Sequence, residues 1–298
     1  MQGELFRSET YTVGKKIRLI ELFGGIGSQA MALRDIGADF EHYRLVEFDR
    51  FAVASYNAIH GTNFIVSDIR NVHGVDLGIE RRNEFTYLLT YSFPCTDLSV
   101  AGKMKGMTKG SGTRSGLLWE VERILNELGD DLPDILLMEN VPQVHSGKNQ
   151  IDFYSWMRFL QKKGYSNFYR DMNAKDYGTA QSRNRCFMVS ILGEYDYSFP
   201  EEMKLKRVLK DYLESDVEDK YFIRSEKVRK LIINLVERGV LPEQNRTEQR
   251  WQIGIDLSSC SSGERKTASA ILARYSKGMC NHRDETTGVA EFREDNIR

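Results

Sequence analysis

The sequence predicts an α/β protein: a parallel β-sheet with helices on both of its faces. Strand-like and helix-like segments alternate through the first two thirds of the 298 residues. The strand-like runs are short, apolar and followed by glycine-rich or polar turns. With 41% hydrophobic and 29% charged residues, the chain can bury a substantial core. A mixed α+β domain is the alternative on pattern alone.

The elements follow in order from the N-terminus. Ile17 to Phe23 is the first expected strand, and a glycine-rich turn then leads into a helix on which Ala30, Leu33 and Ile36 share one face. Asp49 is placed to cap a second helix that runs to His60. Further strands are expected at residues 43–48, 64–66, 86–92, 134–140, 165–172 and 185–192, and further helices at 116–128 and 151–163.

The composition and pattern of the sequence change after Pro200. Residues 201–238 are charge-dense with a helical pattern, and residues 243–266 are polar and rich in Ser, Gln and Arg. We therefore expect one domain over residues 1–199 and a second, smaller region over residues 200–298.

Composition excludes several classes of protein. The net charge of -1 excludes a uniformly basic nucleic-acid coat, although a local basic face is still allowed. No apolar run approaches the roughly 20 residues of a membrane span, and the polar N-terminus has no hydrophobic signal core, so we expect a cytoplasmic protein. The four cysteines are scattered without a CxxC pair, which fits a reducing compartment and predicts no metal ligands. Cys280 and His282 are interpreted as ordinary loop residues.

The turn Gly24-Gly25-Ile26-Gly27 follows a buried strand and opens a helix, where glycines allow a ligand to approach the backbone. Glu47, at the end of the second strand, can accept hydrogen bonds from both ribose hydroxyls of a nucleoside. Asp68 follows the third strand and can accept from an adenine amino group while Ile69 donates its backbone N–H. The alternative is a turn that serves close packing only. Two acids after successive strands favour the nucleoside.

Two further motifs follow later strands, at the carboxyl edge where ligands bind in such sheets. Pro94-Cys95 comes after the fourth strand and Glu139-Asn140-Val141 after the fifth. A cysteine facing a carboxylate at that edge is a plausible nucleophile with an acid beside it, although a buried inert thiol is the usual role of a cysteine.

The segment Ala101 to Gly116 is glycine-rich, basic and free of acids. It predicts a mobile loop that closes on a phosphate backbone, with a merely solvated loop as the alternative. The cations concerned are Lys103, Lys105, Lys109 and Arg114.

Taken together, the glycine turn, the Pro-Cys pair, Glu-Asn-Val and Gln181-Ser182-Arg183-Asn184-Arg185 resemble the ordered motifs of the cytosine-5 DNA methyltransferases. The resemblance covers about Ile17 to Leu192 and implies a Rossmann-like sheet, S-adenosylmethionine as cofactor and double-stranded DNA whose target base is flipped out. A role in bacterial or phage restriction-modification is implied as well. Glu21 stands where the family usually has Asp.

The resemblance also implies roles for individual residues. Cys95 attacks C6 of cytosine, Glu139 holds the N3 and N4 edge, Arg183 and Arg185 orient the base and these two groups, and Asn140 braces the cysteine loop. Gln181 joins the four loop cations as a DNA contact. The cofactor-contacting positions are Phe23, Gly25, Gly27, Glu47, Phe48, Asp68, Ile69, Pro94 and Leu117.

The family's last two motifs are not found in the sequence, so we expect an incomplete recognition region, completed by a missing segment or a second polypeptide. Two other functions stay open. One is a tRNA cytosine-5 methyltransferase, since a tRNA-methylating branch shares these motifs, and the other is a catalytically silent DNA-binding subunit.

Overall fold

The computed structural model describes residues 9–95, 98, 106–110, 112–214, 218, 226–239, 251–256, 267–269, 287–293 and 296–297. The chain divides into two compact units, each of which is described by itself. The first unit is Met1–Met172 with Arg185–Pro200, and the second is Asn173–Asn184 with Glu201–Arg298.

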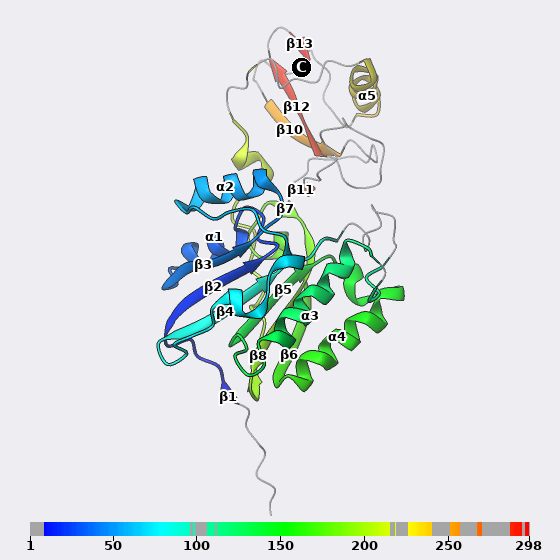
Figure 1. Cartoon of the computed structure of the whole chain (residues 1–298). Helices are drawn as coiled ribbons and strands as arrows, with labels where there is room; N and C mark the ends of the chain where they lie inside the picture. The colour runs from blue at the N-terminus through cyan, green and yellow to red at the C-terminus, as the bar shows by residue number, and fades with distance from the viewer. Residues whose placement is uncertain are drawn as a thin grey trace, which may run out of the picture. The chain divides into compact units, whose positions relative to one another are not determined.

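The first unit is built on a six-stranded sheet with the order β3-β2-β4-β5-β8-β6 (Figure 1). Its strands are β2 (Lys16–Leu22), β3 (Phe40–Val46), β4 (Phe85–Tyr91), β5 (Ile135–Asn140), β6 (Tyr165–Asn173) and β8 (Asn184–Leu192). The first four strands in this order, β3, β2, β4 and β5, pair in parallel. The predicted α/β class is therefore confirmed.

Strand β8 departs from the prediction of a parallel sheet, because it pairs with β5 in the antiparallel sense. Residues 174–183, between β6 and β8, contain no α-helix. Two neighbouring strands that run parallel need a long connection, usually a helix, that carries the chain back to the same end of the sheet. Residues 174–183 provide no such connection, so β8 reverses direction.

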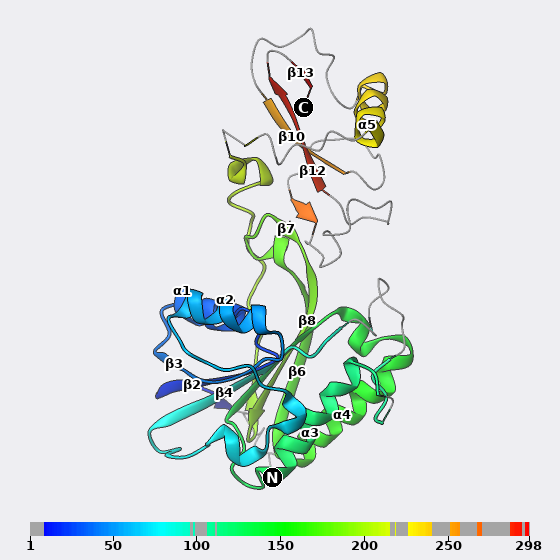
Figure 2. The same cartoon turned by 45° about the horizontal axis from the view of Figure 1, so that its top comes forward.

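The described helices that cover this sheet are α1 (Ser28–Asp35), α2 (Arg50–His60), α3 (Leu118–Glu127) and α4 (Gln150–Lys162). Helices α1 and α2 lie on one face, and α3 and α4 on the other (Figures 1 and 2). As predicted, Asp49 caps α2, since its Oδ1 accepts a 2.7 Å hydrogen bond from the Phe51 N–H. Helix α1 buries Ala30, but Ile36 follows its end and is exposed, so the predicted apolar face stops short of it.

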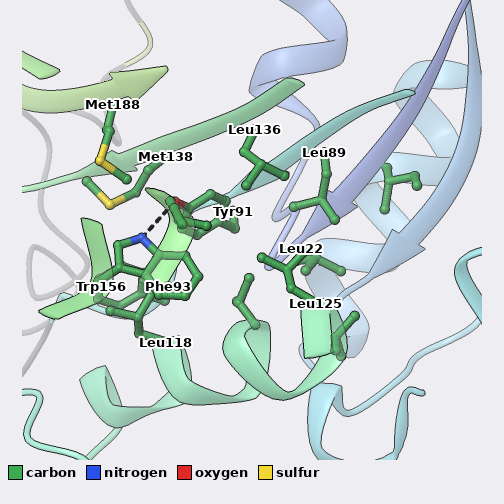
Figure 3. Packing of buried hydrophobic residues seen from close by; sticks show 14 of the residues in the cluster. Leu22, Leu89, Tyr91, Phe93, Leu118, Leu125, Leu136, Met138, Trp156 and Met188 are labelled. Carbon is green, nitrogen blue, oxygen red and sulfur yellow. Dashed lines mark hydrogen bonds between the residues drawn. The ribbon is translucent and has the colours of Figure 1, made fainter. Parts of the chain in front are cut away.

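Large side chains fill the space between the sheet and α3 and α4 (Figure 3). Trp156 of α4 is fully buried and donates its indole N–H to the Tyr91 hydroxyl at 3.0 Å, which satisfies both polar groups inside the core. Met138 of β5 and Met188 of β8 lie beside this pair. This packing holds the ends of β4 and β5, from which two of the predicted motifs emerge.

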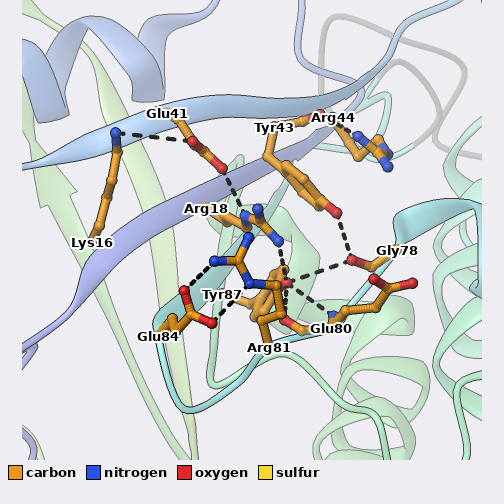
Figure 4. A network of polar contacts seen from close by, with 10 residues as sticks. All are labelled: Lys16, Arg18, Glu41, Tyr43, Arg44, Gly78, Glu80, Arg81, Glu84 and Tyr87. Atoms are coloured by element: carbon orange, nitrogen blue, oxygen red, sulfur yellow. Dashed lines mark hydrogen bonds and ion pairs between the residues drawn. The ribbon is translucent and has the colours of Figure 1, made fainter.

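A polar network joins the amino-terminal parts of β2, β3 and β4 (Figure 4). Its centre is Arg18, which donates to Glu41 Oε1 at 2.7 Å and to the Tyr87 hydroxyl at 2.9 Å. The guanidinium also lies over the rings of Tyr43 and Phe85, with centroids 4.3 and 3.7 Å away. The network ties the three strands together at the end opposite to the predicted site.

The predicted strand at residues 64–66 is wrong, because these residues form no strand. The apolar pattern has another cause. Phe64 packs against a small buried cluster that includes Tyr56, and its backbone N–H and C=O both bond to the Asn57 side chain at 2.9 Å. Ile65 and Val66 are left exposed.

The remaining elements are short or lie in the second unit. In the first unit β1 (Glu9–Thr10) pairs with β9 (Tyr195–Asp196). In the second unit β10 (Trp251–Asp256), β12 (Thr287–Arg293) and β13 (Asn296–Ile297) form an antiparallel sheet, and β7 (Gln181–Ser182) pairs with β11 (Ala268–Ser269). Helix α5 spans Glu226–Glu237. None of the helices in the described part of the chain combines the length and the apolar character of a membrane span.

The described residues also form seven 3-10 turns: η1 (Ile69–Asn71), η2 (Gly74–Leu77), η3 (Ser115–Leu117), η4 (Pro142–His145), η5 (Gly147–Asn149), η6 (Ala174–Asp176) and η7 (Leu209–Tyr212).

Candidate active site

The glycine turn between β2 and α1 requires glycine for two separate reasons. Gly25 and Gly27 have φ angles of 57° and 83°, in the left-handed region that glycine adopts without strain. A Cβ atom at Gly24 would lie only 2.4 Å from Leu45 Cδ1, so the turn can pass this close to β3 only without a side chain. Phe23 also has a positive φ, and its N–H donates to Val46 O at 2.7 Å.

Glu47 follows β3 and lies directly against this turn. Its Oε2 accepts a 2.9 Å hydrogen bond from the Gly25 N–H, and its Oε1 accepts one of 2.8 Å from the Asp49 N–H. A carboxylate offers about four acceptor positions, so each oxygen keeps capacity for a further donor. Phe48, the next residue, is 69% exposed and offers an aromatic face beside the carboxylate. The pair is suited to a ribose with an attached base.

Asp68 begins η1 and is already paired within the chain. Its carboxylate accepts hydrogen bonds of 3.0 Å from the Arg70 backbone N–H and from Arg70 Nε. These hydrogen bonds from Arg70 lower the pKa of the Asp68 carboxyl, which keeps it ionised as an acceptor. Ile69 is buried immediately after it.

The loop that carries Cys95 is fastened at the two residues before the cysteine. Asn140 Nδ2, at the end of β5, donates to Phe93 O at 3.0 Å, and Ser115 Oγ, in η3, donates to Pro94 O at 2.6 Å. Both side chains are buried, which strengthens hydrogen bonds. Cys95 itself is half-buried, so its thiol is held by a supported loop and not sealed in the core.

Glu139 and Arg185 form an ion pair at the same edge of the sheet. Arg185 Nε lies 3.0 Å from Glu139 Oε1, and the two side chains are 18% and 21% exposed. Because β4 and β5 are adjacent and parallel, Cys95, which follows β4, and Glu139, near the end of β5, lie at the same edge of the sheet. The structure thus gathers Cys95, Glu139, Asn140 and Arg185 at one edge.

Arg183 and Gln181 belong to the second unit. The Arg183 N–H donates to Asn173 Oδ1 at 2.9 Å, and the Arg183 carbonyl accepts from the Ala174 N–H at 3.0 Å. Gln181 lies in β7, opposite Ala268 of β11. Their backbone positions are therefore fixed within that unit.

The predicted basic loop is described only in its later part, and Lys103 and Lys105 lie outside the described residues. Lys109 forms a 2.6 Å ion pair with Glu122 of α3, and its ammonium group lies 5.3 Å from the centroid of the Trp119 ring. Met107 is fully buried, and its carbonyl accepts from the Trp119 indole N–H at 2.7 Å. This end of the segment is anchored to α3. Arg114 is its last cation, directly before η3.

A buried network beneath the glycine turn was not predicted from the sequence. The Tyr56 hydroxyl donates to Glu21 Oε2 at 2.5 Å and lies 2.7 Å from His42 Nδ1. Burial raises the pKa of Glu21 to about 7. His60 Nε2 lies 3.1 Å from Ile26 O, in the turn itself. The sign of this network in the sequence was Glu21, an acidic residue inside an apolar strand.

Ser115 is a second residue that the sequence did not single out. It lies in a run read as part of the basic loop, and only the fold brings it under Pro94. The sequence did not single out Gln29 of α1 either. Its Nε2 donates to Ser92 Oγ at 3.2 Å, and Ser92 lies three residues before the cysteine.

Comparison with protein families identifies the chain. The model of the C-5 cytosine-specific DNA methylase family matches residues 17–291, which is most of the sequence. This chain belongs to that family. By class it is a DNA cytosine methyltransferase, and the resemblance read from the four motifs is confirmed.

Named relatives agree with this assignment. The orphan methyltransferase M.SssI of Spiroplasma monobiae is 34% identical over 259 residues, with 69% of this chain and 67% of that protein covered. The type II methyltransferase M2.ScrFI of Lactococcus lactis subsp. cremoris is 29% identical over 261 residues, with 71% of each covered. The orphan methyltransferase M.SPBetaI of Bacillus phage SPbeta is 25% identical, with 77% of this chain and 63% of that protein covered.

Solved structures show the same fold. The Dnmt2 methyltransferase of S. pombe superposes with a TM-score of 0.57 at 21% identity, covering 72% of this chain and 65% of that chain. The methyltransferase EhMeth of Entamoeba histolytica gives 0.59 at 19% identity, covering 77% and 67%. The chain spans about two thirds of the length of the relatives it matches.

Proposed function

We propose that this chain methylates C5 of cytosine in double-stranded DNA, with Cys95 as the nucleophile and S-adenosylmethionine as the methyl donor. The observation that carries the proposal is the grouping at one sheet edge of a loop-borne thiol with the Glu139–Arg185 ion pair. An activated ring, a thiolate and a positioned carboxyl group are what addition to the C5–C6 bond of cytosine requires.

The residues around the glycine turn fit the proposed cofactor. Nothing lies within 4 Å of a Cβ built at Gly25, so the turn is open on that side, and Glu47 is fixed beside it with spare acceptor capacity. Phe48 presents its ring to an adenine, and Asp68 presents a carboxylate to the adenine amino group. Phe23, Gly27, Ile69, Pro94 and Leu117 complete the proposed pocket. S-adenosylmethionine, when bound, supplies a methyl group on a positively charged sulfonium, which C5 of the activated ring receives.

The side chains of the site carry the remaining chemistry. The Cys95 thiolate forms a bond to C6 while Glu139 delivers a proton to N3, so the ring electrons move toward C5 without a net negative charge. After C5 has been methylated, a base removes its proton. The C6–sulfur bond then breaks, the thiolate leaves with its electron pair, and N3 returns its proton to the Glu139 carboxylate, which restores both the aromatic ring and the acid.

Arg185 and Asn140 are proposed as positioning residues. Arg185 holds Glu139 through a charge-assisted contact, which fixes the carboxyl group at the base edge. Asn140 holds Phe93 O, so the sulfur two residues later is kept in line with C6. Arg183 is proposed to contact the base and its phosphate.

The DNA is proposed to meet the basic loop and the second region of the chain. Lys103, Lys105, Lys109 and Arg114 supply the cations that attract the phosphate backbone, and Gln181 lies beside Arg183 in the motif. The cytosine must leave the stack to reach Cys95, as for other enzymes that act on a base. In this scheme residues 1–199 carry the chemistry and residues 200–298 read the target.

The test is transfer of tritiated methyl groups from S-adenosylmethionine to duplex DNA and, in parallel, to tRNA. We expect Cys95→Ser to abolish the label that the unaltered chain transfers to DNA, while Cys260→Ser, which removes a thiol elsewhere in the sequence, keeps the unaltered incorporation. Label in tRNA alone would support the RNA alternative, and label in neither substrate would support a silent subunit. Methylation by Cys95→Ser at the unaltered rate would exclude the nucleophile.

A DNA duplex with 5-fluorocytosine gives an independent readout, because fluorine cannot leave C5 as a cation. The adduct should therefore persist, and mass spectrometry should find it on the peptide that contains Cys95. An adduct on Cys186, Cys260 or Cys280 would contradict the mechanism.

A further inference from the structure

A group of three side chains lies behind the Glu-Asn-Val motif and has no part in the proposed reaction. His145 ends η4, Asp171 lies on β6 and Cys186 lies on β8. One ligand atom from each, an imidazole nitrogen, a carboxylate oxygen and a sulfur, all lie within 4.8 Å of one another. Three separate elements of the first unit thus converge on one point.

We propose that His145, Asp171 and Cys186 bind a thiophilic divalent cation of the zinc class. Imidazole, thiolate and carboxylate are the ligands that Zn²⁺ takes in proteins. The absence of a CxxC pair excludes a compact cysteine site, but it does not exclude one that the fold assembles from three elements. The proposal does not depend on the proposed methyl transfer.

The ligand atoms must rearrange to accommodate the ion, because they lie within 4.8 Å of one another and not yet at coordination distances. His145 Nε2 and Asp171 Oδ1 are 2.9 Å apart. Tetrahedral coordination with zinc-ligand distances of about 2.0–2.3 Å places ligand atoms roughly 3.3–3.6 Å from one another. The His-Asp contact must therefore open by a few tenths of an ångström, and the sulfur must approach to complete the triangle.

Charge and burial are consistent with this cation. Cys186 is fully buried, and burial together with the neighbouring Asp171 raises the pKa of its thiol to about 12. A bound divalent cation displaces the thiol proton, and one thiolate plus one carboxylate then neutralise its two positive charges.

The residues around the proposed site give it an apolar buried side and a side that is open to solvent. The rings of Tyr169 and Phe153 pack against the His145 imidazole, with centroids 5.3 and 5.8 Å away, so the buried side is apolar. Asp171 is exposed, which leaves a path for the ion and a fourth position for water. Such a three-ligand arrangement is typical of zinc sites with one open position. Because Asn140 is the β5 partner of Cys186, the ion would stabilise the backbone that carries Glu139 and Asn140.

The experiment uses Co²⁺ as a spectroscopic probe on the untagged, chelator-treated full chain. Cys95, Cys260 and Cys280 are changed to Ser, so that Cys186 is the one remaining thiol. One equivalent of Co²⁺ should produce a thiolate-to-cobalt charge-transfer band and the visible bands of a four-coordinate site, and Zn²⁺ should displace both. No charge-transfer band with this variant would overturn the proposal.

Ligand variants in the same background assign the other two positions. His145→Gln and Asp171→Asn should each weaken Co²⁺ binding by more than the roughly 10- to 100-fold that loss of an outer-shell partner costs. His73→Gln is the matched control, because His73 pairs with Glu127 on a different part of the surface. Unchanged affinity in both ligand variants would show that the cation binds elsewhere.

A second measurement needs no change to any cysteine. Zn²⁺ should raise the thermal midpoint of the otherwise unaltered chain and saturate at one equivalent, since a ligand that binds only the folded state stabilises it. The shift should disappear in His145→Gln and persist in His73→Gln. A shift that His145→Gln retains would contradict the proposed site.

Discussion

The hydroxyl of Tyr56 donates a 2.5 Å hydrogen bond to Glu21 Oε2 directly beneath the glycine turn, inside a fully buried environment. Tyr56 comes from α2 and Glu21 from β2, so the bond joins a helix to the strand that it covers. The Tyr56 oxygen also lies 2.7 Å from His42 Nδ1. The acid that departs from the family's usual Asp is therefore part of a hydrogen-bonded chain from the core to β3.

The first prediction concerns stability against pH. Burial raises the pKa of Glu21 to about 7, against 4.5 for an unperturbed glutamate. Between these values the folded state holds a proton that the unfolded state has lost, so the free energy of unfolding falls as pH rises through this window. The loss is about 3 kcal/mol at most, at 1.36 kcal/mol per pKa unit.

Urea denaturation at several pH values between 4.5 and 7.5 measures this slope, and Glu21→Gln, which cannot ionise, should flatten it. The hydrogen bond from Tyr56 lowers the Glu21 pKa, so Tyr56→Phe should extend the decline to higher pH. Identical slopes in the unaltered chain and in Glu21→Gln would contradict the assignment.

The second prediction compares two glycines of the turn. A Cβ at Gly27 would lie 2.4 Å from His60 Nε2 and 2.7 Å from Tyr56 Cε2, whereas nothing lies within 4 Å of a Cβ at Gly25. Both have positive φ, so alanine costs about 1–2 kcal/mol of backbone strain at either position. Only Gly27→Ala adds overpacking, worth a further ~1–3 kcal/mol. Denaturation midpoints should rank Gly27→Ala below Gly25→Ala, and equal stabilities would contradict the clash.

The sequence was sufficient to predict where the residues at the ends of strands lie. Cys95 and Glu139 were placed at one edge because parallel strands end together. In the structure Cys95 follows β4, and Glu139 lies near the end of the adjacent strand β5. The glycine turn and the Asp49 cap could also be predicted from the sequence, because both depend on local backbone requirements.

What the sequence could not provide depends on tertiary contacts. Ser115 supports Pro94 only because η3 packs beneath the cysteine loop, and a serine in a glycine-rich run carries no such signal. The 64–66 segment was misread because β-branched residues suggest a strand even where, as at Ile65, they are exposed. The reversal of β8 follows from a connection without a helix, which apolar periodicity does not reveal.

The third prediction tests the proposed cofactor pocket at Glu47. Its carboxylate accepts from the Gly25 and Asp49 N–H groups. Glu47→Gln places an amide N–H₂ against one of these donors and removes the charge offered to the ribose. At roughly 1.5–3 kcal/mol for hydrogen bonds to a charged group, affinity for S-adenosylmethionine should fall about 10- to 100-fold.

Isothermal titration calorimetry measures this affinity. Glu84→Gln is the matched control, because Glu84 is an exposed glutamate paired with Arg81, directly before β4. It should bind the cofactor as the unaltered chain does. A dissociation constant that Glu47→Gln leaves unchanged would count against the pocket.

The last prediction concerns Arg185, whose Nε lies 3.0 Å from Glu139 Oε1 in a half-buried pair. Lysine preserves the charge but lacks the planar fork of donors that fixes a carboxylate, so Arg185→Lys should leave Glu139 present but poorly oriented. If Arg185 positions Glu139 for protonation of the base, kcat should fall by about 10²- to 10³-fold, the range for loss of one preorganised donor. Affinity for S-adenosylmethionine should stay unchanged, because Arg185 lies on β8 whereas the proposed cofactor pocket is built on the glycine turn between β2 and α1. Arg34→Lys, at an exposed arginine paired with Asp35, should keep the unaltered kcat and so serves as the control. Single-turnover rates on duplex DNA separate the chemical step from product release, and an unaltered rate in Arg185→Lys would remove Arg185 from the positioning of Glu139.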